Sequence, residues 1–187
     1  MADFLKAFKH VAGNEGGYAN NPSDRGGETY KGIARKYWGS WGGWKYLDEV
    51  KAVNKSPAYI NKQLGANPKV QALVEQFYKT NFWYPLNLDL IKDQALATNV
   101  YDFGVNAGIG AGAKRLQRAA NEVCGNLTVD GEIGAKTVDA INKLDAKTVY
   151  DNFNKQRKAY YDNIIANDAS QSIFRKSWYS RIIPYQA

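Results

Sequence analysis

The chain has 187 residues, 44% of them hydrophobic, and a formal net charge of +7 with a pI of about 9.3. This length is enough for one substantial hydrophobic core in one or two lobes. No run approaches the roughly 20 apolar residues that a membrane-spanning helix needs. A basic chain favours polyanions such as nucleic acid, acidic membranes or cell wall, but its basic residues are scattered and accompany no nucleic-acid motif.

Residue types that serve metal and redox chemistry are scarce. Cys124 is the single cysteine, so an internal disulfide is excluded, and its neighbours Val123 and Gly125 favour a buried free thiol. His10 is the single histidine and has no companion for a metal site or a catalytic triad. No glycine-rich phosphate loop or nucleophile elbow is visible. The sequence therefore predicts neither a cofactor nor a metal ion.

A first helix is predicted from about residue 4, because Phe4, Phe8 and Val11 recur at a helical period. Glu15 follows Val11 by four residues and falls on the extended line of the core-facing stripe, provided that the last turn continues past Gly13. A carboxylic acid there is partly desolvated, which raises its pKa and suits it to act as a general acid. The alternative is a residue at the helix end that points outward through the break at Gly13.

The rest of the chain is organised around residues 15–34, EGGYANNPSDRGGETYKGIA, which hold three acids and two Gly-Gly pairs. The ordinary interpretation is a surface turn with solvated acids. However, Asp24 follows Glu15 by nine positions and Thr29 follows Asp24 by five. Hydrolysis of a glycoside commonly uses two carboxylates that face each other across a cleft. Asp24 is the expected second acid, and Glu28 is the alternative.

This stretch closely resembles the signature of the glycoside hydrolase family 108 muramidases, phage-type and bacterial endolysins that cleave peptidoglycan. Its Glu-Asp-Thr spacing is also similar to the site of phage-type lysozymes. The resemblance implies a lysozyme-like fold and cleavage of the β-1,4 bond between N-acetylmuramic acid and N-acetylglucosamine. It implies that Glu15 is the catalytic acid. By the same resemblance Asp24 positions water or stabilises positive charge, Thr29 holds that water or the loop, and Tyr18 and Gly27 bind substrate.

After this stretch the pattern predicts a second helix that Thr29 caps and Gly39 ends. Its apolar residues repeat at helical spacing: Tyr30, Ile33, Ala34, Tyr37 and Trp38. The pattern is as consistent with a purely capping role for Thr29 as with a role in the cleft. The next loop, residues 39–44, is rich in glycine and tryptophan. Its Trp41 is expected to stack on a sugar ring, and packing in the core is the alternative.

Residues 45–66 give a weak pattern with one short helix near residues 57–64. From Pro68 a full apolar stripe predicts a helix that reaches Tyr78, and the aromatic residues at 82–84 are expected to pack in the core. A central buried helix is predicted next, with its apolar face formed by Leu96, Val100, Phe103 and Ala107.

Two polar residues interrupt that buried helix, because Asp102 and Asn106 lie four positions apart and thus on one side of it. Their segment looks like the Asp, Val-Asn, Gly segment of family 108, which the resemblance places near the cleft. Asn106 is therefore a predicted substrate-binding residue. A satisfied structural pair that links two lobes is the alternative, and it is favoured for Asp102.

The C-terminal part predicts further helices, one from residues 108–112 to Gly125, a long one through Val149–Ile164 and a final basic, aromatic one over Ile173–Ile183. The phrase TVDGEIGAKTV at residues 128–138 resembles that of peptidoglycan-binding repeats. The same phrase also describes an ordinary turn before a helix.

The fold class expected is all-α, with room for one small β-hairpin near the acidic loop. The expected domains are a family 108 catalytic region at 1–92 and a peptidoglycan-binding-like helical region at 93–187, packed into one lysozyme-like unit. The expected partners are peptidoglycan glycan strands and a holin or other export system, with no nucleic acid, no stable membrane insertion and a monomeric state. The N-terminus lacks a recognisable secretory signal, so we expect synthesis in the cytoplasm and action on the wall after release.

Two other functions remain open at this point. A lytic transglycosylase works with one acid and releases an anhydro sugar, and the fixed spacing of Asp24 argues mildly against it. A non-catalytic wall-binding or secretion-associated protein would keep the lysozyme-like shell without depending on Glu15.

Overall fold

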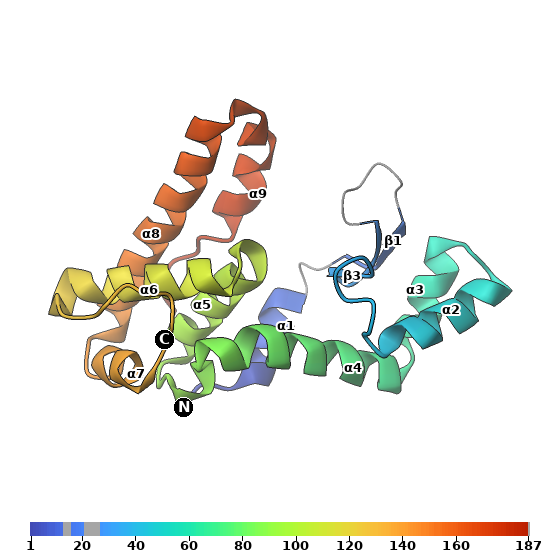
Figure 1. Cartoon of the computed structure of the whole chain (residues 1–187), viewed down its shortest axis with the longest axis horizontal. Helices are drawn as coiled ribbons and strands as arrows, with labels where there is room; N and C mark the ends of the chain where they lie inside the picture. Colours follow the sequence, from blue (N-terminus) through green and yellow to red (C-terminus); the bar gives the residue numbers. More distant parts are fainter. Residues whose placement is uncertain (13–15, 21–26, 187) are drawn as a thin grey trace. The chain divides into compact units, whose positions relative to one another are not determined.

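The computed structural model describes residues 1–12, 16–20 and 27–186 (Figure 1). The chain divides into two compact units, a smaller one of Phe8–Asn81 and a larger one of Met1–Ala7 with Phe82–Ala187. Glu15 and Asp24, the two predicted catalytic acids, lie outside the described residues. The predicted boundary between residues 92 and 93 stays a prediction.

The expected mainly helical fold is confirmed. The α-helices of the described residues are α1 (Phe4–Ala12), α2 (Gly43–Val53), α3 (Pro57–Gly65), α4 (Pro68–Tyr78), α5 (Gln94–Ala107), α6 (Ile109–Cys124), α7 (Ala135–Ile141), α8 (Ala146–Asn167) and α9 (Arg175–Ser180). Shorter helical turns are η1 (Lys79–Trp83), η2 (Tyr84–Leu86), η3 (Leu88–Leu90) and η4 (Ala169–Phe174). Among these helices, none combines the length and apolar character needed to cross a membrane.

The smaller unit contains a three-stranded antiparallel sheet in the order β1 (Tyr18–Asn20), β2 (Glu28–Tyr30) and β3 (Ile33–Ala34). Tyr30 pairs with Tyr18 on one side and with Ile33 on the other. Lys31 and Gly32 join β2 to β3, and both have positive φ, 45° and 77°. Two such residues make the type I′ turn whose twist suits a tight hairpin. The predicted helix that Thr29 caps is therefore wrong, because this segment forms two strands and a turn.

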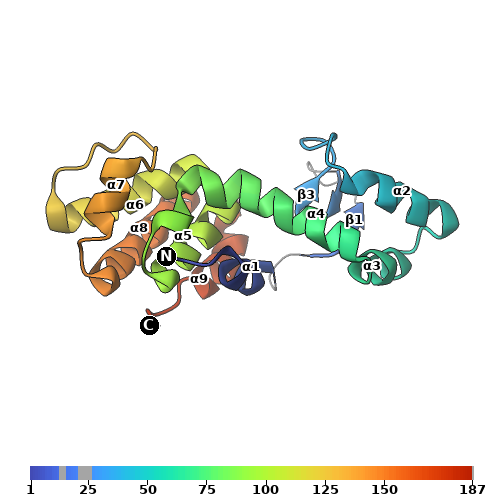
Figure 2. The same ribbon diagram turned by 90° about the horizontal axis from the view of Figure 1, so that it is seen from below.

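The helices α2, α3 and α4 accompany the sheet in the smaller unit. α2, α3 and α4 pack on one another, and α3 contacts β1 (Figure 2). α3 and α4 confirm the helices predicted near 57–64 and from Pro68, and each has a proline in its first turn, where a missing N–H costs nothing. α2 was not predicted, because it buries only Gly43, Trp44 and Leu47 and so shows a weak apolar stripe.

The larger unit is built around α5, which packs against α6 and α8 (Figure 1). The predicted apolar face is confirmed, since Leu96, Val100 and Phe103 are buried. α5 and α6 approach closely at two glycines, because a Cβ at Gly112 would lie 3.5 Å from the Cα of Gly104. Small residues at the crossing let the two backbones come together.

Several expectations for the larger unit need correction. Of the aromatic residues at 82–84, Trp83 is buried as predicted, but Tyr84 is exposed. The final helix is shorter than Ile173–Ile183, because η4 ends at Phe174 and α9 covers only Arg175–Ser180. Cys124 is partly exposed rather than buried, because it is the last residue of α6, one turn beyond the buried face that ends at Ala120.

Candidate active site

Residues 16–18, which follow Glu15 in the motif, are held by contacts that explain why residue 17 is a glycine. The backbone N–H of Tyr18 donates to Oδ1 of Asn61 on α3 at 2.6 Å. A Cβ at residue 17 would overlap with the carboxamide of Asn61, so only glycine allows this approach. The carbonyl oxygen of Gly17 accepts from the N–H of Lys31 at 3.2 Å. The chain just after Glu15 is thus fixed to both α3 and the β2–β3 turn.

Glu28 is surrounded by three donors. It accepts a hydrogen bond from the Tyr18 hydroxyl at 2.9 Å and pairs with Nζ of Lys51 at 2.5 Å and with Nε of Arg35 at 2.6 Å. Its side chain is only 12% exposed. Arg35 also forms two bonds to Asp48, at 2.6 and 3.0 Å, and lies over the ring of Trp44. The carboxylate therefore joins β1 and β2 to α2.

The charge state of this cluster follows from its contacts. Burial by itself raises the pKa of Glu28, but the hydrogen bonds from Lys51 and Tyr18 and the positive charge of Arg35 outweigh it and lower the pKa below its usual value. Burial, and then the bond to Glu28, raise the pKa of the Tyr18 phenol. At neutral pH the ionised Glu28 carboxylate therefore accepts a hydrogen bond from the protonated Tyr18 phenol. A carboxylate held in this way is poorly suited to donate a proton.

Thr29 and Gly27 lie on β2 and at its start. Thr29 pairs with Ala19 and Ala34, and strand alternation places its side chain on the opposite face from the buried Tyr30. Gly27 has φ +65°, a left-handed conformation that favours glycine. Thr29 is thus a strand residue rather than a helix cap, which leaves its hydroxyl available for the predicted role in the cleft.

Trp41 belongs to an aromatic cluster of the smaller unit. Its ring stacks on Tyr30 at 6.3 Å, meets the edge of Trp44 at 5.0 Å and donates from Nε1 to the carbonyl of Leu73 at 3.3 Å. These contacts use much of its surface in packing, and its sugar-binding role stays a prediction. The more exposed rings are Tyr37, at 66%, and Trp38, at 40%. The sequence pattern did not indicate that these two rings are exposed, because it placed both on the apolar face of a predicted helix.

Asn106 lies in the larger unit, on α5, and its Oδ1 accepts from the Tyr161 hydroxyl at 2.9 Å. One turn earlier, Asp102 is buried and pairs with Arg157 at 2.7 Å and Arg181 at 3.0 Å. Asp102 therefore has a structural role, but its partners belong to its own unit, so the expectation that it links two lobes is wrong. The polar side chains on this side of α5 therefore have their partners on α8 and on the segment after α9.

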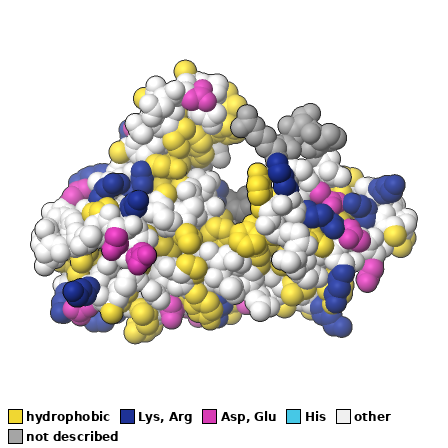
Figure 3. All heavy atoms as spheres, in the orientation of Figure 1, with side chains coloured by type: hydrophobic (Ala, Val, Ile, Leu, Met, Phe, Trp, Pro, Cys, Tyr) yellow, Lys and Arg dark blue, Asp and Glu magenta, His cyan; other side chains and the backbone are white. Residues whose placement is uncertain are grey.

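Charged groups elsewhere in the described residues were compared with the arrangement of a metal centre. In the part of the chain that the structure describes, no three or more His, Cys, Asp or Glu residues gather as they would around a metal ion. Figure 3 shows Lys and Arg side chains dispersed among acidic and apolar ones on the face that it presents. The basic side chains therefore do not gather into a single patch on this face.

Comparisons with known proteins agree with this architecture. The profile of the family described as "Glycosyl hydrolase 108" matches residues 8–108, and the one described as "Predicted Peptidoglycan domain" matches residues 111–183. The structure is similar to that of Brucella abortus SagA, with a TM-score of 0.63 and 28% sequence identity, over 96% of this chain and 88% of that one. No significant match was found among the curated proteins.

The two profiles together cover most of the chain, and a glycosyl hydrolase profile followed by a peptidoglycan profile shows that the protein is a peptidoglycan hydrolase. The chain belongs to the glycosyl hydrolase 108 family and is a glycoside hydrolase of the lysozyme type.

Proposed function

We propose that the protein is an N-acetylmuramidase that hydrolyses the β-1,4 bond between N-acetylmuramic acid and N-acetylglucosamine. Glu15 donates its proton to the glycosidic oxygen as the bond to the anomeric carbon breaks. Asp24 takes a proton from the water that adds to that carbon, or stabilises its positive charge. Thr29 helps to hold the water or the loop, and Tyr18, Gly27, Trp41 and Asn106 contribute to binding.

The observation that supports this assignment most is that the Glu28 carboxylate is already bound by neighbouring side chains. The motif offers three acids, and two carboxylates are needed for glycoside hydrolysis. Glu28 is held by Lys51, Arg35 and Tyr18 and has a lowered pKa. This leaves Glu15 and Asp24 as the reacting pair, on the two chain segments that lead into and out of β1 in the sequence.

Product analysis in water enriched in heavy oxygen tests the reaction. Muramic acid reducing ends that carry one heavy oxygen atom support the muramidase. Anhydromuramic ends without heavy oxygen would show a lytic transglycosylase, and labelled glucosamine ends would show cleavage of the other glycosidic bond. If purified walls are bound and no new ends form, the protein is a wall-binding module instead.

The same proposal places the protein's action at the cell wall, as a monomer, after release from the cytoplasm through a holin or another export system. Co-expression with and without a holin, with lysis followed by turbidity, tests this route. Lysis that needs the holin supports the holin route, and lysis of equal speed without the holin contradicts that route and leaves the other export system.

A further inference from the structure

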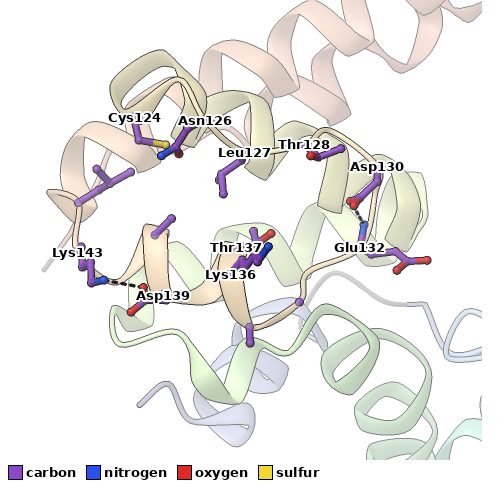
Figure 4. Close-up of a pocket in the computed structure, with 14 residues that line it drawn as sticks. Cys124, Asn126, Leu127, Thr128, Asp130, Glu132, Lys136, Thr137, Asp139 and Lys143 are labelled. Atoms are coloured by element: carbon purple, nitrogen blue, oxygen red, sulfur yellow. Dashed lines mark hydrogen bonds and ion pairs between the residues drawn. The ribbon is translucent and has the colours of Figure 1, made fainter.

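The larger unit has a hollow that lies between α7 and the loop that joins α6 to α7 (Figure 4). Its volume is about 820 Å³, within the roughly 300–1,000 Å³ that is usual for small-molecule sites. Cys124 and Leu127 come from the side of α6 and the loop, and Thr137 and Lys143 from α7 and the segment after it. In Figure 4 the side chain of Leu127 projects from the loop toward α7.

Two amide side chains of α6 hold the loop wall in place. Asn121 donates to the carbonyl of Leu127 at 2.7 Å and accepts from its N–H at 2.8 Å. The buried Gln117 donates to Asp130 at 2.7 Å and to the carbonyl of Glu132 at 2.9 Å, and it accepts from the N–H of Gly131 at 2.9 Å. A loop fixed at both ends in this way presents a preformed wall, which lowers the entropy cost of binding.

The chemistry of the lining disfavours a bare glycan chain. Sugar rings commonly stack on aromatic side chains, and none of the described residues that line the hollow is aromatic. Three carboxylates and two ammonium groups line it, those of Asp130, Glu132, Asp139, Lys136 and Lys143. Its formal charge is therefore −1 in a chain whose net charge is +7. An anionic polymer that carries no ammonium group would find a better partner elsewhere on the protein.

Two of these charges are free to meet a ligand. Lys143 pairs with Asp139 at 2.6 Å, and Asp130 accepts hydrogen bonds from Gln117 and from the N–H of Glu132. The Glu132 carboxylate and the Lys136 ammonium have no ion-pair partner among the described residues. A ligand that carries both an ammonium and a carboxylate would satisfy both groups.

We infer that this hollow binds the peptide stem of peptidoglycan, a short peptide that ends in free carboxylates and carries the side-chain amine of a diamino acid. The amine forms an ion pair with Glu132, a carboxylate forms an ion pair with Lys136, and Leu127 contacts the methyl groups of the alanine residues. This inference rests on the proposed function only in taking peptidoglycan as the polymer. It assigns the peptide to this hollow and leaves the glycan to the residues named in the proposed function.

Cys124 supplies the test, because it is the single cysteine and it lines the hollow. The rate at which a small maleimide modifies it is measured with a synthetic tetrapeptide stem, with the same peptide acetylated on its side-chain amine, and with an N-acetylglucosamine oligomer. At 10 mM peptide and a Kd of about 1 mM, roughly nine-tenths of the sites are filled, so the free peptide should slow modification about tenfold. The acetylated peptide and the sugar oligomer should have little effect.

Variants Glu132→Gln and Lys136→Gln change exposed side chains and should fold normally. Each should weaken peptide affinity about fivefold, as expected for an exposed charge pair. Lys147→Gln removes an exposed lysine from α8, outside the hollow, and is the control, with wild-type protection expected. Calorimetric titration of the peptide into the same proteins checks that protection reports binding.

The inference is overturned if the tetrapeptide neither protects Cys124 nor binds by calorimetry, or if the sugar oligomer protects as well as the peptide. It is also overturned if the two pocket variants behave as Lys147→Gln does. Wall hydrolysis by the same wild-type preparation is measured in parallel. Hydrolysis without peptide protection leaves the proposed function standing, whereas protection without hydrolysis contradicts only the proposed function.

Discussion

The Tyr18 hydroxyl donates a hydrogen bond of 2.9 Å to Glu28, which joins the first strand of the smaller unit to the second. Lys51 and Arg35 complete the surroundings of that carboxylate. The tyrosine of the Glu-Gly-Gly-Tyr motif therefore has a structural task in addition to any contact with substrate. One acid of the motif is thus anchored in the fold, and Glu15 and Asp24 are the two that we propose to react.

Glu28→Gln should destabilise the protein by about 1–3 kcal/mol, because it leaves Lys51 and Arg35 beside a neutral amide in a site that is only 12% exposed. Urea denaturation of the variant and the wild type measures this difference. Asp48→Asn is the matched control, since Asp48 is 53% exposed and should contribute less than about 1 kcal/mol. Equal losses in the two variants would show that burial of Glu28 does not matter.

The contribution of Glu28 should depend on pH in a defined direction. Its pKa is lower in the folded protein than the ordinary value of 4.5, so folding favours the ionised form. The stabilisation is fully present above about pH 4.5 and is lost as the pH falls through the folded-state pKa. The difference between the unfolding free energies of wild type and Glu28→Gln should therefore shrink in acid. A difference that grows below this pH would contradict the lowered pKa.

Gly17→Ala should destabilise the smaller unit by about 1–3 kcal/mol, because the new Cβ overlaps with the Asn61 carboxamide. Thermal denaturation of four proteins, wild type, Gly17→Ala, Asn61→Ala and the double variant, measures the coupling between the two positions. The cost of Gly17→Ala should fall in the Asn61→Ala background. Gly16→Ala is the control, because no described atom lies within 4 Å of a Cβ added there. Additive costs would show that Asn61 is not the obstacle.

Asp102→Asn should destabilise the larger unit by about 3–5 kcal/mol, because it leaves the buried Arg157 and the nearby Arg181 without their shared counter-charge. The exposed pair of Asp151 and Lys147 on α8 offers the comparison, and Asp151→Asn should cost less than about 1 kcal/mol. Urea denaturation separates the two cases. A loss below 1 kcal/mol for Asp102→Asn would mean that Asn in its place is well accommodated.

The long helices could be predicted from the sequence because each buries a continuous stripe. α4 shows Val70, Val74 and Phe77 at helical spacing, and α5 shows Val100 and Phe103. The turn at Gly131 and the start of α7 after Gly134 were also recognisable, since glycine marks both positions. The residues that give the family resemblance could be found in the same way, because they stand together in one short stretch.

The small hairpin expected near the acidic loop is present, but its strands and their register could not be predicted, for physical reasons. β1 and β2 have three residues each and β3 has two, so an alternating pattern has no room to show. The turn uses Lys31 at positive φ, whereas asparagine or aspartate is the usual signal there. The structural role of Glu28 could not be predicted either, because Lys51 and Arg35 reach its carboxylate only once α2 and the hairpin are folded.

We propose that Glu15 donates the proton and that Glu28 stabilises the fold. Release of new reducing ends from purified peptidoglycan, divided by the folded fraction, is measured for wild type, Glu15→Gln and Glu28→Gln. This assignment of roles predicts that Glu15→Gln loses at least about 10²-fold in rate, as expected for loss of a general acid, and that Glu28→Gln stays close to wild type. A Glu15→Gln protein that still cleaves, beside a folded Glu28→Gln protein that does not, would contradict it.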